Sequence, residues 1–508
     1  MNKQAYNNIH YEFMSANYEG AFFPNSLLLF IDFPENAFLG NRAAYRTLWH
    51  EYMHFLQCTT TTYGINIFMR ELELAKLTIA CVQDIKKITS NIKFPLMLWH
   101  KNTNEKTVLE VLDTYIKYRA IIEEDLATLQ GACTYDTKSK RIVYQGKPVF
   151  NQAGCPFQDY YQDPTCSVPV PVGSRAIMEG AASLLEFLYL TFLDKMGGDP
   201  ECKAMSDEWA KNKEDDYAYY VTIDMATHFL KNEGEGCIAK LLALSDLALC
   251  PPVEFTPLSC RDDVQRYPGR RFIEALKIAA ESPQMNLVEF HDRYHDFVGN
   301  ICSRLGWPLP WDMASNSLIN HIENEYLSSK NDPFCDLIGP ALVILNGLTL
   351  RKRYPMYCAN PIPNIAEAFR IANTRKAEGK GAAIIHWEMI YNAHTPPFVK
   401  MRDGHRMLSK LAKKAMVGQI EMNEDELFLE VTKSFEKYFF ILRLSSTLWT
   451  GRNMINGAIK CLQLDASQHD YCNGYFLKND NQFSNDCKCR DMFHDFFGFY
   501  PNDVEWLL

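Results

Sequence analysis

The chain has 508 residues, of which 47% are hydrophobic, and its formal net charge is -10. This length is enough for about two or three domains with a sizeable buried core. The acidic balance disfavours a nucleic-acid partner, because phosphate binding depends on clustered Lys and Arg. No apolar run reaches the roughly 18 residues of a membrane-spanning helix, so we expect no membrane partner either.

The cysteines and the first residues of the chain indicate the cellular compartment in which the protein is expected. The 16 cysteines are scattered, and the start of the chain, MNKQAYNN, lacks the apolar segment of a secretion signal. Without export, cysteines are expected to be free thiols in a reducing environment. We therefore expect a cytoplasmic protein.

Strand and helix signals alternate near the beginning of the chain. The mainly apolar segment 25–33 has a proline on each side, which predicts a buried or edge strand. We expect a helix at 42–58 that ends in the run of four threonines before Gly64, because β-branched residues followed by glycine are typical of a helix end. A second helix is expected at 66–87.

The next segments mix helix and irregular structure. Helical periodicity predicts a helix at 107–130, and RIVYQGKPVF at 141–150 predicts a hairpin that turns at Gln145-Gly146. Segment 155–173 is rich in Pro, Gln and Asp, which favours a long irregular loop.

The rest of the chain is expected to be mainly helical. A strong helix should run from Ser174, as its N-cap, to a stop at Gly197-Gly198. Proline-bearing breaks interrupt the later helices at 251–257, 308–310, 354–363 and 395–397. From about residue 465 the chain is less periodic and richer in Asn, Asp, Cys and aromatic residues.

The most informative pattern is H-E-x-x-H at residues 50–54, inside the helix expected at 42–58. On a helix His50 and His54 share a face, so both imidazoles can bind one metal ion. Glu51 lies beside them, within reach of a water molecule at the metal, as in a zinc hydrolase. The alternative is a core helix with two incidental histidines, but burying these three side chains without a ligand would be costly.

A third ligand must come from elsewhere, because a catalytic zinc takes three protein ligands and leaves one position open. The main candidate is Glu179, and the rival is Glu73, or Glu71 beside it, which lies closer to His54 in the sequence. Glu73 could equally be an ordinary acid on a solvated helix face that pairs with nearby basic residues. Another acid or histidine also remains possible at this point.

Two segments resemble the gluzincin family of zinc metallopeptidases. HEYMHFLQ at 50–57 resembles H-E-x-x-H-x-x-Q, and MEGAA at 178–182 resembles the family's E-G-x-A element. The resemblance implies that Glu179 is the third zinc ligand. It also implies that Gly180 and Ala182 are packing residues that let the glutamate helix lie close to the motif helix.

The resemblance covers about residues 25–60 and 174–197. It implies an α+β, predominantly helical protein with a zincin-like catalytic core, in which a small sheet, the motif helix and the glutamate helix come together. This core would occupy residues 1–200. The spacing departs from the family pattern, because more than a hundred residues separate His54 from Glu179, so 65–172 would be an insertion.

Beyond this core, residues 201–460 would form a mainly helical region that walls the cleft, and 461–508 a tail rich in Cys and aromatic residues. Near the ligands, Glu186 and Gln57 could orient the histidines, or could be ordinary polar residues. Hydrolysis also needs a donor for the developing oxyanion. The composition leaves several Tyr and His candidates open, among them His228, His321, Tyr326, His386 and His394.

Two other groups have the spacing of metal ligands. His291 and His295 lie one helical turn apart, although the nearby acids and arginine favour a solvated helix face. The tail residues His469, Cys472, Cys487 and Cys489 could form a structural zinc site, or could be separate buried thiols.

These patterns predict a zinc-dependent metallopeptidase that acts on a peptide or protein substrate, with Zn2+ on His50, His54 and Glu179 and with Glu51 as general base. One alternative is a zinc hydrolase of a non-peptide amide or ester. Another is a non-enzymatic helical interaction protein with a degenerate metalloprotease core. We find no phosphate loop, dinucleotide-binding glycine motif or serine nucleophile elbow.

Overall fold

The computed structural model describes residues 20–23, 27–33, 42–129, 133–136, 141–143, 170–197, 204–205, 217–231, 235–252, 267–283, 285, 287–313, 320–321, 338–356, 358–359, 398–401, 406–408, 424–451, 454–455, 458–460, 475–477 and 488–507. Helices account for 77% of the described residues that can be interpreted, and small sheets complete the structure, which confirms the predicted helix-rich α+β class. Within these ranges, no helix is both long and apolar enough to cross a membrane.

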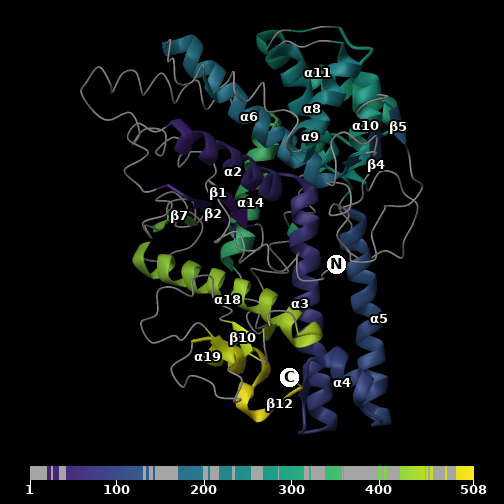
Figure 1. Cartoon of the computed structure of the whole chain (residues 1–508), viewed down its shortest axis with the longest axis vertical. Coiled ribbons are helices and arrows are strands. Elements are labelled where there is room, and N and C mark those ends of the chain that lie inside the picture. The colour runs from purple at the N-terminus through teal and green to yellow at the C-terminus, as the bar shows by residue number, and fades with distance from the viewer. Residues whose placement is uncertain are drawn as a thin grey trace.

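A four-stranded sheet combines residues from distant parts of the chain. Its strands are β1 (Gly20–Phe23), β2 (Leu28–Ile31), β7 (Phe398–Met401) and β8 (Arg406–Leu408), in that order. The β1–β2 and β7–β8 pairs are antiparallel, whereas β2 and β7 are parallel. The strand predicted within 25–33 is confirmed by β2, and β1 was missed. Helix α2 (Arg42–Thr60) packs on β1 and β2 (Figure 1).

Helix α2 confirms the motif helix expected at 42–58 and is two residues longer at its end. The threonine run adds side-chain hydrogen bonds to carbonyls in the last turns of this buried helix. The hydroxyls of Thr59 and Thr60 donate to the carbonyls four residues earlier, both at 2.7 Å, and Thr61 donates to the Gln57 carbonyl. The side chain of Thr61 also caps the next helix by accepting from the Gly64 amide.

The next helix, α3 (Thr62–Ile88), begins four residues before the expected 66–87. The prediction that the motif helix ends at Gly64 was wrong, because Gly64 lies in the first turn of α3. The reason is steric: a Cβ at this position would come within 2.1 Å of the Cys58 carbonyl oxygen, so only glycine lets the two helices join this closely.

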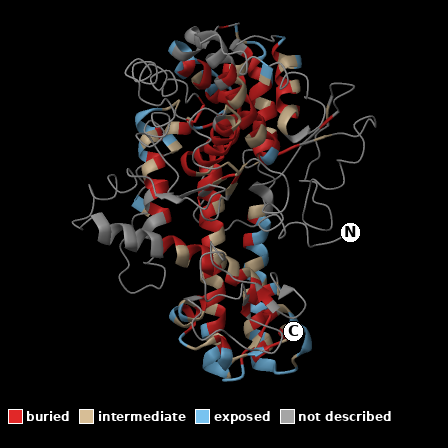
Figure 2. Cartoon of the chain, turned by 60° about the vertical axis from the view of Figure 1, so that its left-hand side comes forward, coloured by how far each residue is buried: buried red, intermediate tan, exposed pale blue. Residues whose placement is uncertain are grey.

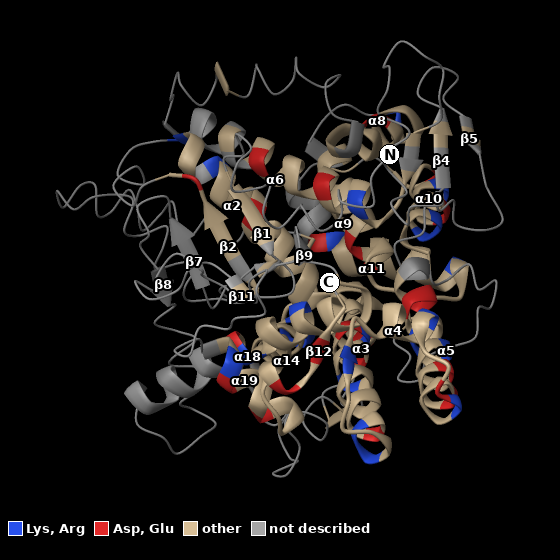
Figure 3. Cartoon of the chain, turned by 60° about the horizontal axis from the view of Figure 1, so that its bottom comes forward, with Lys and Arg blue, Asp and Glu red and all other residues tan. Residues whose placement is uncertain are grey.

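The region between the motif helix and the glutamate helix contains β3 (Lys93–Phe94), α4 (Leu96–Asn102) and α5 (Lys106–Leu129). Helix α5 confirms the helix expected at 107–130, and it lies alongside α3. On the exposed sides of these two helices, basic and acidic side chains alternate (Figure 3), as in the pairs Lys87–Asp84 and Arg119–Glu123.

A three-stranded antiparallel sheet follows, in the order β5 (Arg141–Val143), β4 (Cys133–Asp136) and β6 (Val170–Val172). Strand β5 is the first arm of the hairpin predicted at 141–150, and it pairs with β4, which precedes it. The proposed turn and second arm lie outside the described residues. Part of the loop predicted at 155–173 is strand β6, where Pro171 fits an edge position among the described strands.

The glutamate helix, α6 (Ser174–Gly197), confirms the predicted start and stop. The later helices are α8 (Tyr217–Leu230), α9 (Glu235–Ala248), α10 (Pro268–Ala279), α11 (Leu287–Leu305), α12 (Pro310–Met313), α14 (Ile338–Arg353), α18 (Glu424–Thr450) and α19 (Lys488–Phe497). The remaining elements are β9 (Met454–Ile455), β10 (Ala458–Lys460), β11 (Tyr475–Leu477), the 3-10 helix Pro501–Asp503 and β12 (Glu505–Trp506). Strand β12 pairs in parallel with β3.

In the part of the chain that the structure describes, the buried apolar side chains form two clusters, one toward each end of the molecule (Figures 1 and 2). The upper cluster surrounds α2, α6 and α8 to α11, and the lower one surrounds α4, α18 and α19. Helix α3 joins them, because Tyr63 belongs to the upper cluster and Ile65 to Ile85 line the lower one. The motif helix therefore lies in the upper core, and α3 connects it to the lower core.

Candidate metal centre

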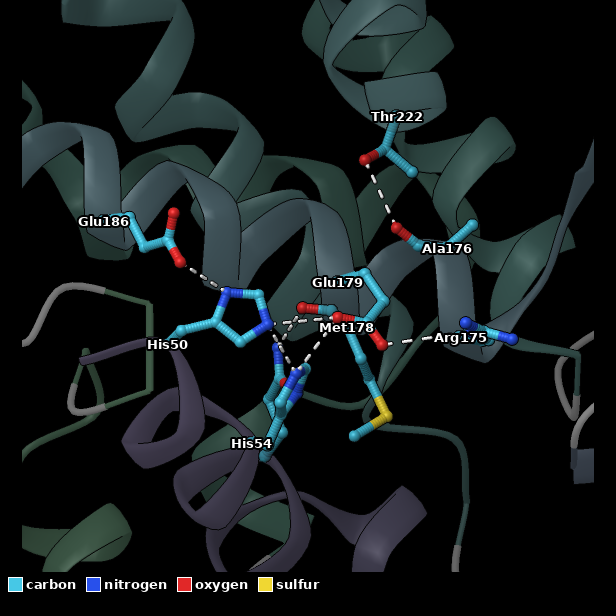
Figure 4. A network of polar contacts seen from close by, with 9 residues as sticks. His50, His54, Arg175, Ala176, Met178, Glu179, Glu186 and Thr222 are labelled. Carbon is cyan, nitrogen blue, oxygen red and sulfur yellow. Dashed lines mark hydrogen bonds and ion pairs between the residues drawn. The ribbon is translucent and has the colours of Figure 1, made fainter. Parts of the chain in front are cut away.

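Helices α2 and α6 bring three side chains together (Figure 4). His50 and His54 lie one turn apart on α2, and Glu179 faces them from α6. The Nε2 atoms of the two histidines are 3.1 Å apart, and each lies 3.2 Å from the Glu179 Oε2. Both histidines are buried, and the Glu179 side chain is 16% exposed.

These three distances are compatible with a bound metal ion. A tetrahedral zinc ion with bonds of about 2.0–2.1 Å holds its ligand atoms roughly 3.3 Å apart. The observed triangle of two imidazole nitrogens and one carboxylate oxygen has nearly this size. His50, His54 and Glu179 therefore form a group that could hold a metal ion.

The electrostatics of the group favour a cation at its centre. Burial lowers the pKa of His50, but the carboxylates of Glu179 and Glu186 outweigh burial and raise this pKa well above its ordinary value. Burial alone would raise the pKa of Glu179, yet the two adjacent histidines hold it far below the usual range. The site stabilises positive charge beside an ionised carboxylate, which is what a metal ion also requires.

Each histidine has a second partner on its other ring nitrogen. The His50 Nδ1 lies 3.0 Å from the Glu186 Oε1, close enough for an ion pair although not aligned as a hydrogen bond. The His54 Nδ1 lies 3.0 Å from the Gln57 Oε1, and the Gln57 amide nitrogen donates to the Met178 carbonyl at 3.1 Å. Both side chains that the sequence left as possible orienting residues thus contact the two histidines.

Glu51 is buried beside this group, with 7% of its surface exposed. Burial raises the pKa of Glu51, and the charges of His50 and His54 oppose that rise. Strand β1 passes directly over this side chain: a Cβ on Gly20 would lie 3.1 Å from the Glu51 Cγ and 2.4 Å from the Thr47 Cγ2. A glycine therefore allows the edge of the sheet to lie against Glu51.

Gly180 has a different neighbour from the one the resemblance implied. A Cβ at Gly180 would lie 2.1 Å from the Thr222 hydroxyl of α8, and that hydroxyl donates to the Ala176 carbonyl at 3.5 Å. The close approach that Gly180 permits is thus between α6 and α8 rather than between α6 and the motif helix. Ala182 is fully buried in the upper cluster.

The rival ligand Glu73 lies in another setting. Its carboxylate pairs with Arg70 at 2.6 Å, and Arg70 also lies 3.3 Å from Asp125 of α5. Burial raises the pKa of Glu73, and the hydrogen bond from Arg70 opposes this shift. Arg70 thus joins α3 to α5, and Glu73, its partner within α3, is not among the three residues grouped around the candidate metal position.

Tyr219, on α8, is a neighbour of the site that the sequence did not single out. Its ring centroid lies 5.6 Å from that of His50. With 26 tyrosines in the chain, only its place on the helix after the glutamate helix could have distinguished it. Of the candidates considered, His228 is exposed on α8 and His321 is half-buried, whereas Tyr326, His386 and His394 lie outside the described residues.

The other predicted metal groups are only partly within the described residues. The His295 ring is exposed and packs edge-on to Trp311, with centroids 4.9 Å apart, and the side chain of His291 is not among those described. Cys489 is buried in the lower apolar cluster. The tail residues His469, Cys472 and Cys487 lie outside the described residues.

In comparisons with known proteins, no family model, no curated protein and no solved structure matches this chain.

Proposed function

We propose that this protein is a zinc-dependent metallopeptidase of gluzincin type, with His50, His54 and Glu179 as zinc ligands and Glu51 as general base. The observation that carries the proposal is the triangle of ligand atoms at 3.1 and 3.2 Å with a buried carboxylate one residue from His50. Two imidazoles and one glutamate are a typical ligand set of catalytic zinc, which keeps its fourth position open.

The chemistry divides between the metal and the protein. Zinc, when bound, acts as a Lewis acid that lowers the pKa of water and polarises a carbonyl. Glu51 accepts the proton of the attacking water and delivers it to the leaving amine. A pKa raised by burial suits this role, because the carboxylate then holds a proton more readily than an exposed glutamate does. Tyr219 is a candidate donor to the developing oxyanion.

Strand β1 favours an extended peptide as the substrate. It is the outer strand of the four-stranded sheet among the described residues, and its Gly20 lies against Glu51. An extended peptide can add to such an edge through main-chain hydrogen bonds. This addition would bring a peptide bond close to Glu51, whereas a small amide or ester would not need the edge.

The metal and the base are tested separately. We expect the purified protein to carry close to one zinc per chain, measured by elemental analysis. His50→Ala should lose the metal, and the exposed His295→Ala should keep it. Glu51→Gln should keep the metal and lose hydrolysis, while Glu110→Gln, an exposed acid on α5, should change neither.

Activity should be followed on denatured proteins, with mass spectrometry of the products, and on small chromogenic amides and esters. Cleavage of the denatured proteins, but not of the small amides and esters, supports the proposal. Cleavage of only the small compounds would indicate the non-peptide hydrolase, and full activity of Glu51→Gln would exclude the mechanism.

A further inference from the structure

Gln57 lies where the motif helix meets the glutamate helix, and it is fully buried. Both ends of its side-chain amide have partners. The oxygen lies 3.0 Å from the His54 Nδ1, and the nitrogen donates to the Met178 carbonyl at 3.1 Å. Met178 directly precedes the ligand Glu179, so one amide joins a histidine of α2 to the ligand segment of α6.

The partners determine which way this amide points. A backbone carbonyl can only accept, so the group that faces the Met178 carbonyl must be the amide NH2. A flipped amide would place two carbonyl oxygens against each other in a buried site, which is costly. The Gln57 oxygen therefore faces His54, and it can only accept a hydrogen bond.

This orientation selects one form of the His54 ring. A neutral imidazole carries one proton, and the acceptor at Gln57 places that proton on Nδ1, while the His50 Nε2, 3.1 Å from the His54 Nε2, can donate to the nitrogen that is left bare. The Nε2 atom then has a free lone pair. This is the atom that faces His50 and Glu179, at 3.1 and 3.2 Å. The ring is thus in the form that a metal ion requires at Nε2.

We propose that Gln57 is a positioning residue that fixes the tautomer of His54 before any metal binds. Through Gln57 and the Met178 carbonyl, the backbone of α6 sets His54, and through Glu186 a side chain of α6 contacts His50 directly. One helix therefore supplies a ligand and orients the two other ligands. The inference rests on the metal-site part of the proposed function and does not depend on hydrolysis.

The test reads the tautomer directly. Nitrogen-15 NMR of histidine-labelled, metal-free protein at mildly alkaline pH distinguishes a protonated from an unprotonated ring nitrogen. The signals of His54 are identified as those missing from the spectrum of the His54→Ala variant. In the wild-type protein, we expect the proton of His54 on Nδ1. In Gln57→Leu, which has neither polar partner, we expect a mixture of both tautomers and a zinc affinity about 10–100-fold lower.

Gln57→Glu separates the two roles of the amide. Its carboxylate still accepts from His54 but has no donor for the Met178 carbonyl, so we expect the Nδ1 tautomer to be kept. Gln83→Leu, at an exposed position of α3, is the matched control and should behave as wild type. Zinc affinity is measured by competition with a chromophoric chelator.

A proton on Nε2 of His54 in the wild-type protein would overturn the inference, as would Gln57→Leu with unchanged tautomer and zinc affinity. These results differ from a failure of the proposed function. A protein with the expected tautomer that binds zinc but cleaves no substrate would exclude the peptidase and leave the role of Gln57 intact. The wild-type spectrum decides the matter even if Gln57→Leu does not fold.

Discussion

Gly20 and Glu51 lie so close that a methyl group on Gly20 would come within 3.1 Å of the Glu51 Cγ. Gly20→Ala should therefore displace Glu51, and it should lower peptide hydrolysis by about 10-fold or more, since small misplacements at a reacting centre are costly. Zinc content should not change, because Gly20 does not face the ligands. Gly299→Ala on α11, where a Cβ meets nothing within 4 Å, is the control and should leave hydrolysis unchanged.

The clash at Gly20 also provides a rescue experiment. The closest atom to the added methyl group would be the Thr47 Cγ2, at 2.4 Å. Thr47→Ser removes this atom, so the double variant should recover thermal stability relative to Gly20→Ala while the contact with Glu51 remains. Recovery of full activity in the double variant would mean that Glu51 is not the residue displaced.

Glu186 should affect metal affinity through His50. Its carboxylate lies 3.0 Å from the His50 Nδ1, and a negative partner there makes the ring a stronger ligand. Glu186→Gln removes the charge while keeping the shape, and we expect zinc affinity to fall about 10–100-fold. A chelator competition assay measures this, with Glu110→Gln as control, and equal affinity in both variants would contradict the role.

The buried threonines at the end of α2 should contribute to stability. Thr60→Val keeps the side-chain shape but removes the hydroxyl that donates to the Leu56 carbonyl at 2.7 Å. The Leu56 carbonyl keeps its backbone partner in α2, so the variant loses one buried hydroxyl hydrogen bond, and we expect a loss of about 0.5–1.5 kcal/mol of unfolding free energy. Thr450 makes the same bond to Ser446 at the exposed end of α18, so Thr450→Val should cost much less. Urea denaturation compares the two, and equal midpoints would refute the argument.

Asp246 should be among the most sensitive buried positions. It accepts from Arg351 at 2.5 Å and from the Tyr294 hydroxyl at 3.0 Å, and so joins α9, α14 and α11. Asp246→Ala leaves the buried Arg351 charge without its carboxylate, and we expect a loss of about 3–5 kcal/mol. The exposed pair Arg304–Glu281 should contribute little by comparison.

A double variant tests the same argument about charge. Replacing both partners, as in Asp246→Leu with Arg351→Met, should cost less than removing the carboxylate alone, because no unpaired charge remains buried. Denaturant unfolding of the two variants makes the comparison. A double variant less stable than Asp246→Ala would show that packing, rather than the unpaired charge, dominates here.

The parts of the site that depend on local spacing could be predicted from the sequence. His50 and His54 follow from one helical turn, and Glu179 from its resemblance to a known element. The limits of α6 follow from Ser174 and the glycine pair. Each of these features can be predicted from a few neighbouring residues in the sequence.

Features that depend on distant residues could not be predicted in this way. Strand β1 completes a sheet in which β2 pairs with β7, and a parallel pair needs a long connection whose partner no local pattern identifies. The packing of Gly180 on Thr222 and the approach of Tyr219 to His50 depend on how α8 crosses α6. The same is true of β6, because its strand character comes from its pairing with β4.

Helix α3 is a long connection between the motif helix and the lower core. It has 27 residues and is therefore about 40 Å long, so a tilt of about 5° at its first turn would move its far end by about 3.5 Å. This first turn is fastened to the end of α9: the Tyr63 amide donates to the Leu249 carbonyl at 3.0 Å, and the Thr62 hydroxyl donates to the Pro251 carbonyl. We therefore expect the contacts of this first turn with Leu249 and Pro251 to limit how far a movement of the lower core displaces His54.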